Sequence, residues 1–188
     1  MRILFATIAI LFLSSCAGYK LINAKSVNVK GMNVQPQTMW SKTPDSLGNN
    51  VELWTVDGRQ LNQLIFIGAL ANNQRLFTPP SKELPMPVFK AGMLPNEMQD
   101  LVSSSLKNLY GGDVDITTSN LRPTEVAGQI GFRFNLSYFT KNGLAKQGDV
   151  LVLEKDKRLY SMIFIATKLH YFDKHAPEFD HMANSIII

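Results

Sequence analysis

The alternation of apolar and polar residues between 129 and 167 is the feature that most constrains the fold. Residues 129–140 alternate strongly, Asn142-Gly143 follows them, and two further apolar runs cover 148–153 and 159–167. Asn-Gly between alternating runs is the strongest short-range signal for a β-hairpin. The charged residues 154–157 provide a second tight turn. The sequence therefore predicts three consecutive antiparallel strands.

The turn at Asn142-Gly143 also predicts a register. A two-residue turn would pair Lys141 with Leu144, so that Phe134 would face Leu151 and Arg133 would lie on the opposite face. Both faces of the three strands hold apolar residues under this register. We therefore expect a sheet that is covered on both sides.

The other segments fit the same architecture. Residues 71–92 contain four prolines and predict a long irregular connection, because proline lacks the backbone donor of a strand or a helix interior. Apolar residues at three- and four-residue spacing predict an amphipathic helix over 94–110, with Pro95 in its first turn. We expect a closing helix within 169–186, starting either at Leu169 or after Pro177. Further strands are predicted over 26–34 (with a bulge at Gly31), 51–56, 61–70 and 114–120.

The fold class predicted from these elements is α+β, a mainly antiparallel sheet with helices on both faces (an α/β/α sandwich). Hydrophobic residues make up 45% of the 188 residues and charged residues 18%, an ordinary globular balance. The domain organisation predicted is a signal peptide over 1–15, a tether over 16–25 and one α+β domain over 26–188.

The N-terminus carries a targeting signal. Arg2 is followed by the apolar run 3–13, which is too short to span a bilayer, and then by Ser14-Ser15-Cys16. Leu13-Ser14-Ser15-Cys16 resembles the lipobox of bacterial lipoproteins, which implies cleavage before Cys16 and acylation of its thiol. A buried helix with an incidental cysteine and an ordinary cleaved signal are the alternatives. By the same resemblance, Ala17 after the cysteine favours the outer membrane, facing the periplasm.

The charge distribution and the single cysteine argue against nucleic-acid binding and against a disulfide or a cysteine metal site. The net charge is +4, and the basic residues are scattered without the stripe or patch of a nucleic-acid-binding surface. Cys16 is the only cysteine, so its acylation would leave no thiol for a disulfide or a metal site. We therefore expect a membrane partner through Cys16, no nucleic acid and no cofactor.

The mature segment resembles a known fold family. The order of its elements, with the segment 159–172 (Leu-Tyr-Ser-Met-Ile-Phe-Ile-Ala-Thr-Lys-Leu-His-Tyr-Phe) and the helix and Asn184-Ser185-Ile186 after it, is similar to the PsbP-like α/β/α sandwich. The resemblance covers residues 26–188. It implies a non-catalytic accessory or binding module.

Few residues indicate a catalytic, metal or ligand-binding site. Arg133 with Asn135 on one strand face could hold an anion, or Arg133 could form a salt bridge. His170 and His181 are weak metal candidates, since eleven residues apart they would share a face only of a continuous helix. No Gly-x-Ser-x-Gly elbow or phosphate-binding glycine loop occurs.

The sequence therefore favours a lipid-anchored, non-enzymatic envelope protein that binds a partner protein or an envelope component. The alternative is a carrier of a small ligand or lipid, with a cleft under the 71–92 loop. A hydrolase with a site that has no sequence signature is the third hypothesis.

Overall fold

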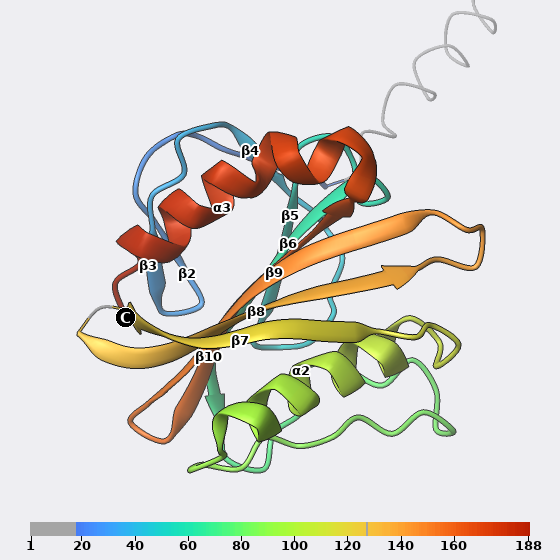
Figure 1. The fold of residues 1–188 in the computed structure, drawn as a ribbon. Helices are drawn as coiled ribbons and strands as arrows, with labels where there is room; N and C mark the ends of the chain where they lie inside the picture. Colours follow the sequence, from blue (N-terminus) through green and yellow to red (C-terminus); the bar gives the residue numbers. More distant parts are fainter. Residues whose placement is uncertain (1–17, 127) are drawn as a thin grey trace, which may run out of the picture.

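The computed structural model describes residues 18–126 and 128–188 and contains an eight-stranded antiparallel sheet (Figure 1). The strand order is β1-β4-β5-β6-β10-β9-β8-β7, and β2 and β3 form a separate hairpin. Cys16 and the predicted signal peptide lie outside the described residues. In chain order the elements are β1 (Lys20–Ile22), β2 (Val27–Val29), β3 (Met32–Val34), β4 (Trp40–Lys42), β5 (Val51–Thr55), β6 (Asn62–Ala71), α2 (Pro95–Leu109), β7 (Thr117–Val126), β8 (Gln129–Phe139), β9 (Ala145–Lys155), β10 (Arg158–Thr167), the irregular turn η2 (Lys168–Phe172) and α3 (Asp173–Ser185).

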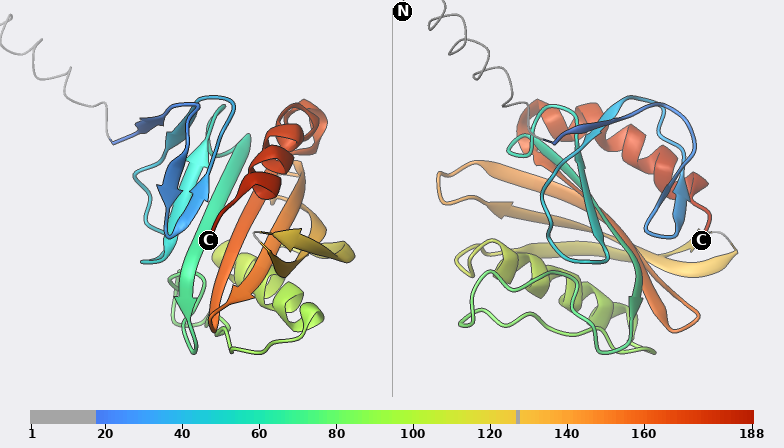
Figure 2. Two further views of the ribbon diagram at one scale, coloured as in Figure 1. Left: turned by 90° about the vertical axis from the view of Figure 1, so that its left-hand side faces the viewer. Right: turned by 180° about the vertical axis from the view of Figure 1, so that it is seen from behind.

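The sheet is covered on both faces, which confirms the predicted three-layer α+β class. Helix α2 lies on one face, and α3 with the β2–β3 hairpin lies on the other (Figures 1 and 2). Each face has its own apolar core. Phe134, Val150 and Ile163 belong to the α2 core, whereas Leu151 and Phe164 belong to the α3 core. The central strands thus bury both sides, as strands between two layers do.

Helix α2 follows from the local sequence. Pro95 occupies the first position, where a missing N–H costs nothing, and the Glu97 carboxylate accepts a hydrogen bond from the Leu94 N–H at 2.7 Å. The helix ends at Leu109, and Gly111 and Gly112 follow it with φ angles of 94° and 81°, in the left-handed region. The buried side chains form one stripe, made of Met98, Leu101, Val102, Ser105 and Leu106.

The turn between β8 and β9 has three residues rather than the predicted two. The Thr140 N–H donates to the Leu144 carbonyl at 3.0 Å, and Gly143 takes a φ of 77°, as in a type I turn closed by a left-handed residue. The predicted register was therefore wrong by one residue, and Phe134 pairs with Val150. A shift of one residue in the pairing moves the side chains of one strand to the opposite face relative to its partner. Arg133 accordingly lies beside Leu151 on the α3 side.

Two predictions near the N-terminus were also wrong. Residues 26–34 form a hairpin, not one bulged strand, because Lys30 and Gly31 both take positive φ angles (53° and 87°) and reverse the chain. The prediction of a tether over 16–25 was wrong for Lys20–Ile22, which forms β1 and pairs with β4 at the edge of the sheet.

The closing helix was predicted to start either at Leu169 or after Pro177. Helix α3 starts at Asp173, with Pro177 inside its second turn, and ends at Ser185. Neither predicted start was right, because β10 continues to Thr167 and η2 follows it. Beyond the helix, the Ile187 N–H donates to the Asn33 carbonyl at 3.0 Å and ties the tail to β3. The strand predicted over 114–120 begins at Thr117 and continues to Val126.

The 71–92 connection is irregular, as predicted, apart from one isolated bridge between Arg75 and Val88. Its apolar side chains pack into the α2 core, including Leu76, Phe77, Met86 and Phe89. Within residues 18–126 and 128–188, no helix has the length and apolarity needed to cross a bilayer.

Candidate functional site

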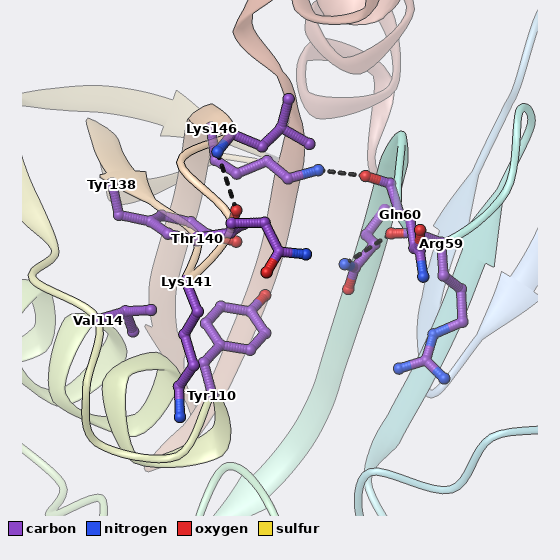
Figure 3. A pocket seen from close by; sticks show the side chains of 11 residues that line it. Arg59, Gln60, Tyr110, Val114, Tyr138, Thr140, Lys141 and Lys146 are labelled. Carbon is purple, nitrogen blue, oxygen red and sulfur yellow. Dashed lines mark hydrogen bonds between the residues drawn. The ribbon is translucent and has the colours of Figure 1, made fainter.

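A cavity of about 660 Å³ opens beside the C-terminal end of α2. Its walls come from the β5–β6 connection, the start of β6, the β8–β9 hairpin and the segment after α2. Figure 3 shows Tyr110, Tyr138 and Lys146 on one side and Arg59 and Gln60 on the other. The full lining is Arg59, Gln60, Gln63, Tyr110, Val114, Tyr138, Thr140, Lys141, Asn142, Leu144 and Lys146.

The lining is basic. It carries Arg59, Lys141 and Lys146 and no carboxylate side chain. Two of these cations have acidic partners outside the lining. Arg59 lies 2.9 Å from Asp45, and Lys141 lies 2.6 Å from Asp113. The first pair is partly exposed and the second largely exposed, so solvent weakens both. The third cation, Lys146, dominates the charge of the cavity.

Lys146 is a buried cation without a carboxylate partner among the described residues. Its side chain is 5% exposed, and its ammonium donates to the Gln60 carbonyl and, at 3.1 Å, to the Thr167 hydroxyl. Burial lowers the pKa of Lys146, because water no longer solvates the charged form. A lysine ammonium has three donors, and the two neutral acceptors leave its charge uncompensated. An incoming anion would supply the missing charge.

Two tyrosines form the floor of the cavity. The rings of Tyr110 and Tyr138 stack with their centroids 5.4 Å apart. Burial, opposed by Tyr138 and by the charge of Arg59, raises the pKa of Tyr110 to about 12, so this phenol stays protonated at neutral pH. Burial also raises the pKa of Tyr138. The phenols can therefore act as hydrogen-bond donors.

Two polar atoms of the lining are buried without a hydrogen-bond partner among the described residues. They are the Tyr110 hydroxyl and the Arg59 Nε. Buried polar groups are nearly always satisfied, so each such atom points to a water or a ligand that completes it. Both atoms are donors when protonated, as is the Lys146 ammonium. The cavity thus offers donors and positive charge to a ligand that carries acceptors.

The arrangement suits a ligand with an acidic group and an apolar part. Pockets of about 300–1,000 Å³ commonly bury small ligands. Val114, Leu144 and the tyrosine rings supply apolar surface, and Lys146 supplies charge. Among the described lining residues there is no serine, histidine or carboxylate that could serve as a nucleophile or a general base.

Arg133 and Asn135 do not form an anion site together. Arg133 forms salt bridges, which was the alternative that the sequence left open. The Arg133 guanidinium bridges Asp149 at 2.6 Å and Asp180 at 2.5 Å, and it lies 5.3 Å from the centre of the Phe179 ring. Asn135 instead accepts a hydrogen bond from Asn120 at 3.0 Å. Two carboxylates already surround the cation, so Arg133 joins α3 to the sheet and offers an anion no excess positive charge.

The histidines do not form a metal site in the described part of the chain, where no group of three or more His, Cys, Asp or Glu side chains could hold an ion. His170 is exposed in η2, with a φ of 71°, and packs edge-on against Tyr171. His181 lies in α3, which starts three residues after His170, so the continuous helix needed to place them on one face does not exist.

The buried histidine, His175, has a structural role. It contacts the Asp57 carboxylate at 2.5 Å, and Lys174 lies 3.0 Å from the same group. Burial acts to raise the pKa of Asp57, but the bonds from Lys174 and His175 outweigh it and hold that pKa below the ordinary value. On the same helix, Glu178 accepts the Gln37 N–H at 2.7 Å. These contacts fasten α3 to two connections of the sheet.

The cavity could not be predicted from the sequence because its residues come from three separate stretches, 59–63, 110–114 and 138–146. One signal was present. Lys146 stands in phase with Gly148, Val150 and Val152, all of which are buried. A lysine on the inward face of a strand is rare, because a buried ammonium group needs a partner for its charge.

The cleft predicted under the 71–92 loop corresponds to two smaller hollows. They measure about 380 and 410 Å³ and are lined largely by loop residues such as Arg75 and Pro79. The 660 Å³ cavity contains Gln63, near the start of β6, whereas the loop leaves β6 after Ala71. The principal cavity therefore lies away from the predicted place.

Comparison with known proteins shows the fold. The solution structure of cyanobacterial PsbP (CyanoP) from Synechocystis sp. PCC 6803 matches with a TM-score of 0.57 and 12% sequence identity, over 93% of this chain and 95% of that one. The chain therefore has a PsbP-like fold, as its sequence predicted. LpqN, which is involved in cell envelope biogenesis of Mycobacterium tuberculosis, also matches, with a TM-score of 0.36, 11% identity and coverage of 93% and 86%. No family model and no curated sequence matches.

Proposed function

We propose that this protein is a lipid-anchored, non-catalytic envelope protein whose PsbP-like domain binds a small ligand with an acidic group. The observation that carries the proposal is Lys146, a buried cation that faces a cavity and has no carboxylate partner among the described residues. The Leu13–Cys16 lipobox supports the anchor, and Ala17 favours the outer membrane.

The ligand proposed carries a carboxylate or phosphate joined to a short apolar chain. The acidic group would sit near Lys146, within reach of the Tyr110 hydroxyl, and the apolar part would lie against Val114 and Leu144. The described lining holds no serine, cysteine, histidine or carboxylate, the usual nucleophiles and general bases of hydrolases, and this favours binding over hydrolysis. This assigns the carrier role to a different cavity from the one under the 71–92 loop.

The test uses three probes that share one chain length: decanoate, decyl phosphate and decanol. The purified protein is titrated with each probe and followed by NMR or calorimetry. We expect both anions to bind and decanol to bind at least about tenfold more weakly, a difference of about 1.4 kcal/mol. Equal binding of all three would contradict the role of charge, and no binding of any probe would contradict a ligand site.

Variants locate the site. Lys146→Met keeps the length of the side chain and removes the charge, so it should abolish the preference for the anions over decanol. Lys168→Met removes an exposed lysine of η2 outside the cavity and should leave that preference unchanged. Equal effects of the two variants would contradict a specific role of Lys146. Native mass spectrometry on protein purified from its own host would identify the physiological ligand.

Anchoring is tested separately. Cys16→Ser should release the protein from membranes, and retention of an unacylated form would contradict the lipoprotein proposal. A partner protein in the envelope, which the sequence favoured, remains a second proposal. Crosslinking in intact cells tests it, and repeated failure to recover an envelope partner would count against it.

A further inference from the structure

The start of the described chain is held tightly against the domain. Gly18 has a φ of 76°, and a Cβ at this position would lie 2.8 Å from the Cβ of Pro44. Only a glycine fits such a contact in this conformation. Two residues later the chain enters β1, which pairs with β4 through Leu21 opposite Ser41. The domain is thus fixed from Gly18 onward.

This leaves very little chain between the domain and the lipidation site. One residue, Ala17, separates Cys16 from Gly18 in the sequence. Two extended steps span at most about 7 Å. If Cys16 carries acyl chains in the bilayer, the β1 edge of the sheet must lie at the headgroup layer.

The β1 edge exposes apolar side chains where the bilayer would be. Tyr19, Leu21 and Met39 are 56%, 58% and 60% exposed. Tyr19 and Leu21 are two residues apart, so they share a face of the extended chain. Met39 precedes Ser41 by two residues and therefore lies diagonally opposite Leu21 on that face.

Two lysines lie close to these side chains in the sequence. Lys20 and Lys25 are exposed and make no ion pair within the described residues, and Lys20, between Tyr19 and Leu21, points to the other face of the strand. Exposed apolar residues flanked by lysines are what an interfacial membrane contact needs, because the apolar groups enter the headgroup boundary and the lysines meet anionic lipids. β1 is also the outermost strand, so no other strand of the sheet covers this edge (Figure 2).

From these observations we infer that Tyr19, Leu21 and Met39 form a membrane-docking surface that holds the domain in one orientation on an anionic phospholipid bilayer. The inference rests on the proposed acylation of Cys16 but goes beyond it. Acylation alone would allow a tumbling domain, whereas docking fixes which edge meets the lipid. The occupant of this surface is the bilayer itself.

The experiment places one reporter at the β1 edge of the sheet and another on β8, next to the strand at the opposite edge. The full acylated protein is inserted into vesicles of dibrominated phosphatidylcholine with phosphatidylglycerol, and tryptophan quenching by bromine is measured. Tyr19→Trp and Leu21→Trp place the reporter in the docking surface. Ile130→Trp places it on β8, where the native side chain is 72% exposed. Six strand intervals separate β1 from β8, which amounts to roughly 29 Å.

We expect strong quenching at positions 19 and 21 and none at position 130, relative to the unsubstituted protein. The native Trp40 and Trp54 are buried and give a constant background. Lack of quenching at position 19 overturns the docking surface, and equal quenching at 19 and 130 shows a tumbling domain and overturns it too.

Flotation and intact mass measured on the same samples separate the two proposals. Protein that floats and carries acyl chains but shows no quenching at position 19 refutes docking and leaves the anchor standing. Protein without acyl chains refutes the anchor, and docking with it.

Discussion

Replacing Arg133 with methionine tests how α3 is held to the sheet. Arg133 is 9% exposed, and its partner Asp149 has a side chain that is 13% exposed. Removing one partner of a buried ion pair costs about 3–5 kcal/mol, because the other charge is left buried and unpaired. The second partner, Asp180, is 52% exposed, so its pair with Arg133 adds less than about 1 kcal/mol. The expected loss for Arg133→Met is about 3–5 kcal/mol.

The assay is urea unfolding at pH 7, followed by far-UV circular dichroism. Asp180→Asn is the matched control and should cost less than about 1 kcal/mol, since it leaves the pair with Asp149 intact. The double variant Arg133→Met with Asp149→Leu should recover most of the loss, because no buried charge remains.

The loss in Arg133→Met should depend on pH. Burial raises the pKa of Asp149, opposed by Arg133, so removing the guanidinium raises that pKa further. A carboxyl whose folded pKa exceeds its unfolded value destabilises the fold above the folded pKa and not below the unfolded value of about 3.9. The difference from the unsubstituted protein should therefore shrink as the pH falls toward about 4. A cost below about 1 kcal/mol at pH 7, combined with weaker binding of an anion, would refute the structural role.

Three further predictions follow from single contacts. Glu178→Gln should lower the free energy of unfolding by about 1–3 kcal/mol, because the charged acceptor of the Gln37 N–H at 2.7 Å is lost; unchanged urea unfolding would contradict this. Gly148→Ala should cost about 1–3 kcal/mol, since the new Cβ would lie 2.6 Å from the Phe164 carbonyl oxygen, and an unaltered melting temperature would exclude the clash. Asp57→Asn should destabilise at pH 7, and this cost should decrease as the pH falls below about 3.9. The lowered pKa of Asp57 means that the carboxylate stabilises the fold above about 3.9 and loses that effect as the pH falls through the folded pKa, so a cost that does not decrease in acid would count against the ion pairs.

The architecture could be predicted from the sequence because local periodicity carries it. The alternation from Gln129 to Thr167, the stripe of α2 and the prolines of 71–92 led to a sheet covered on both faces. The register of β8 could not be predicted, because Asn142-Gly143 suits a two-residue turn and also the end of a three-residue turn. The choice is made by side chains distant in sequence, which bury Phe134 on the α2 side.

Less of the candidate site than of the fold could be predicted from the sequence. Arg133 was recognised as unusual, but its partner Asp180 is 47 residues away and cannot be paired with it by pattern. Lys146 carried a signal in its inward phase, yet Gln60, whose carbonyl accepts from it, is 86 residues away. A cavity lined by three separate stretches of the chain becomes visible only when the chain is folded.

The three-residue turn between β8 and β9 has a consequence for comparing this chain with distant relatives. If the pairing slipped by one residue to close a turn of two residues, Arg133 would move to the α2 side and away from Asp180. A turn that gains or loses a residue while Phe134 still pairs with Val150 leaves every side chain on its own face. The length of this hairpin loop can therefore differ among relatives only where the pairing of the two strands is preserved.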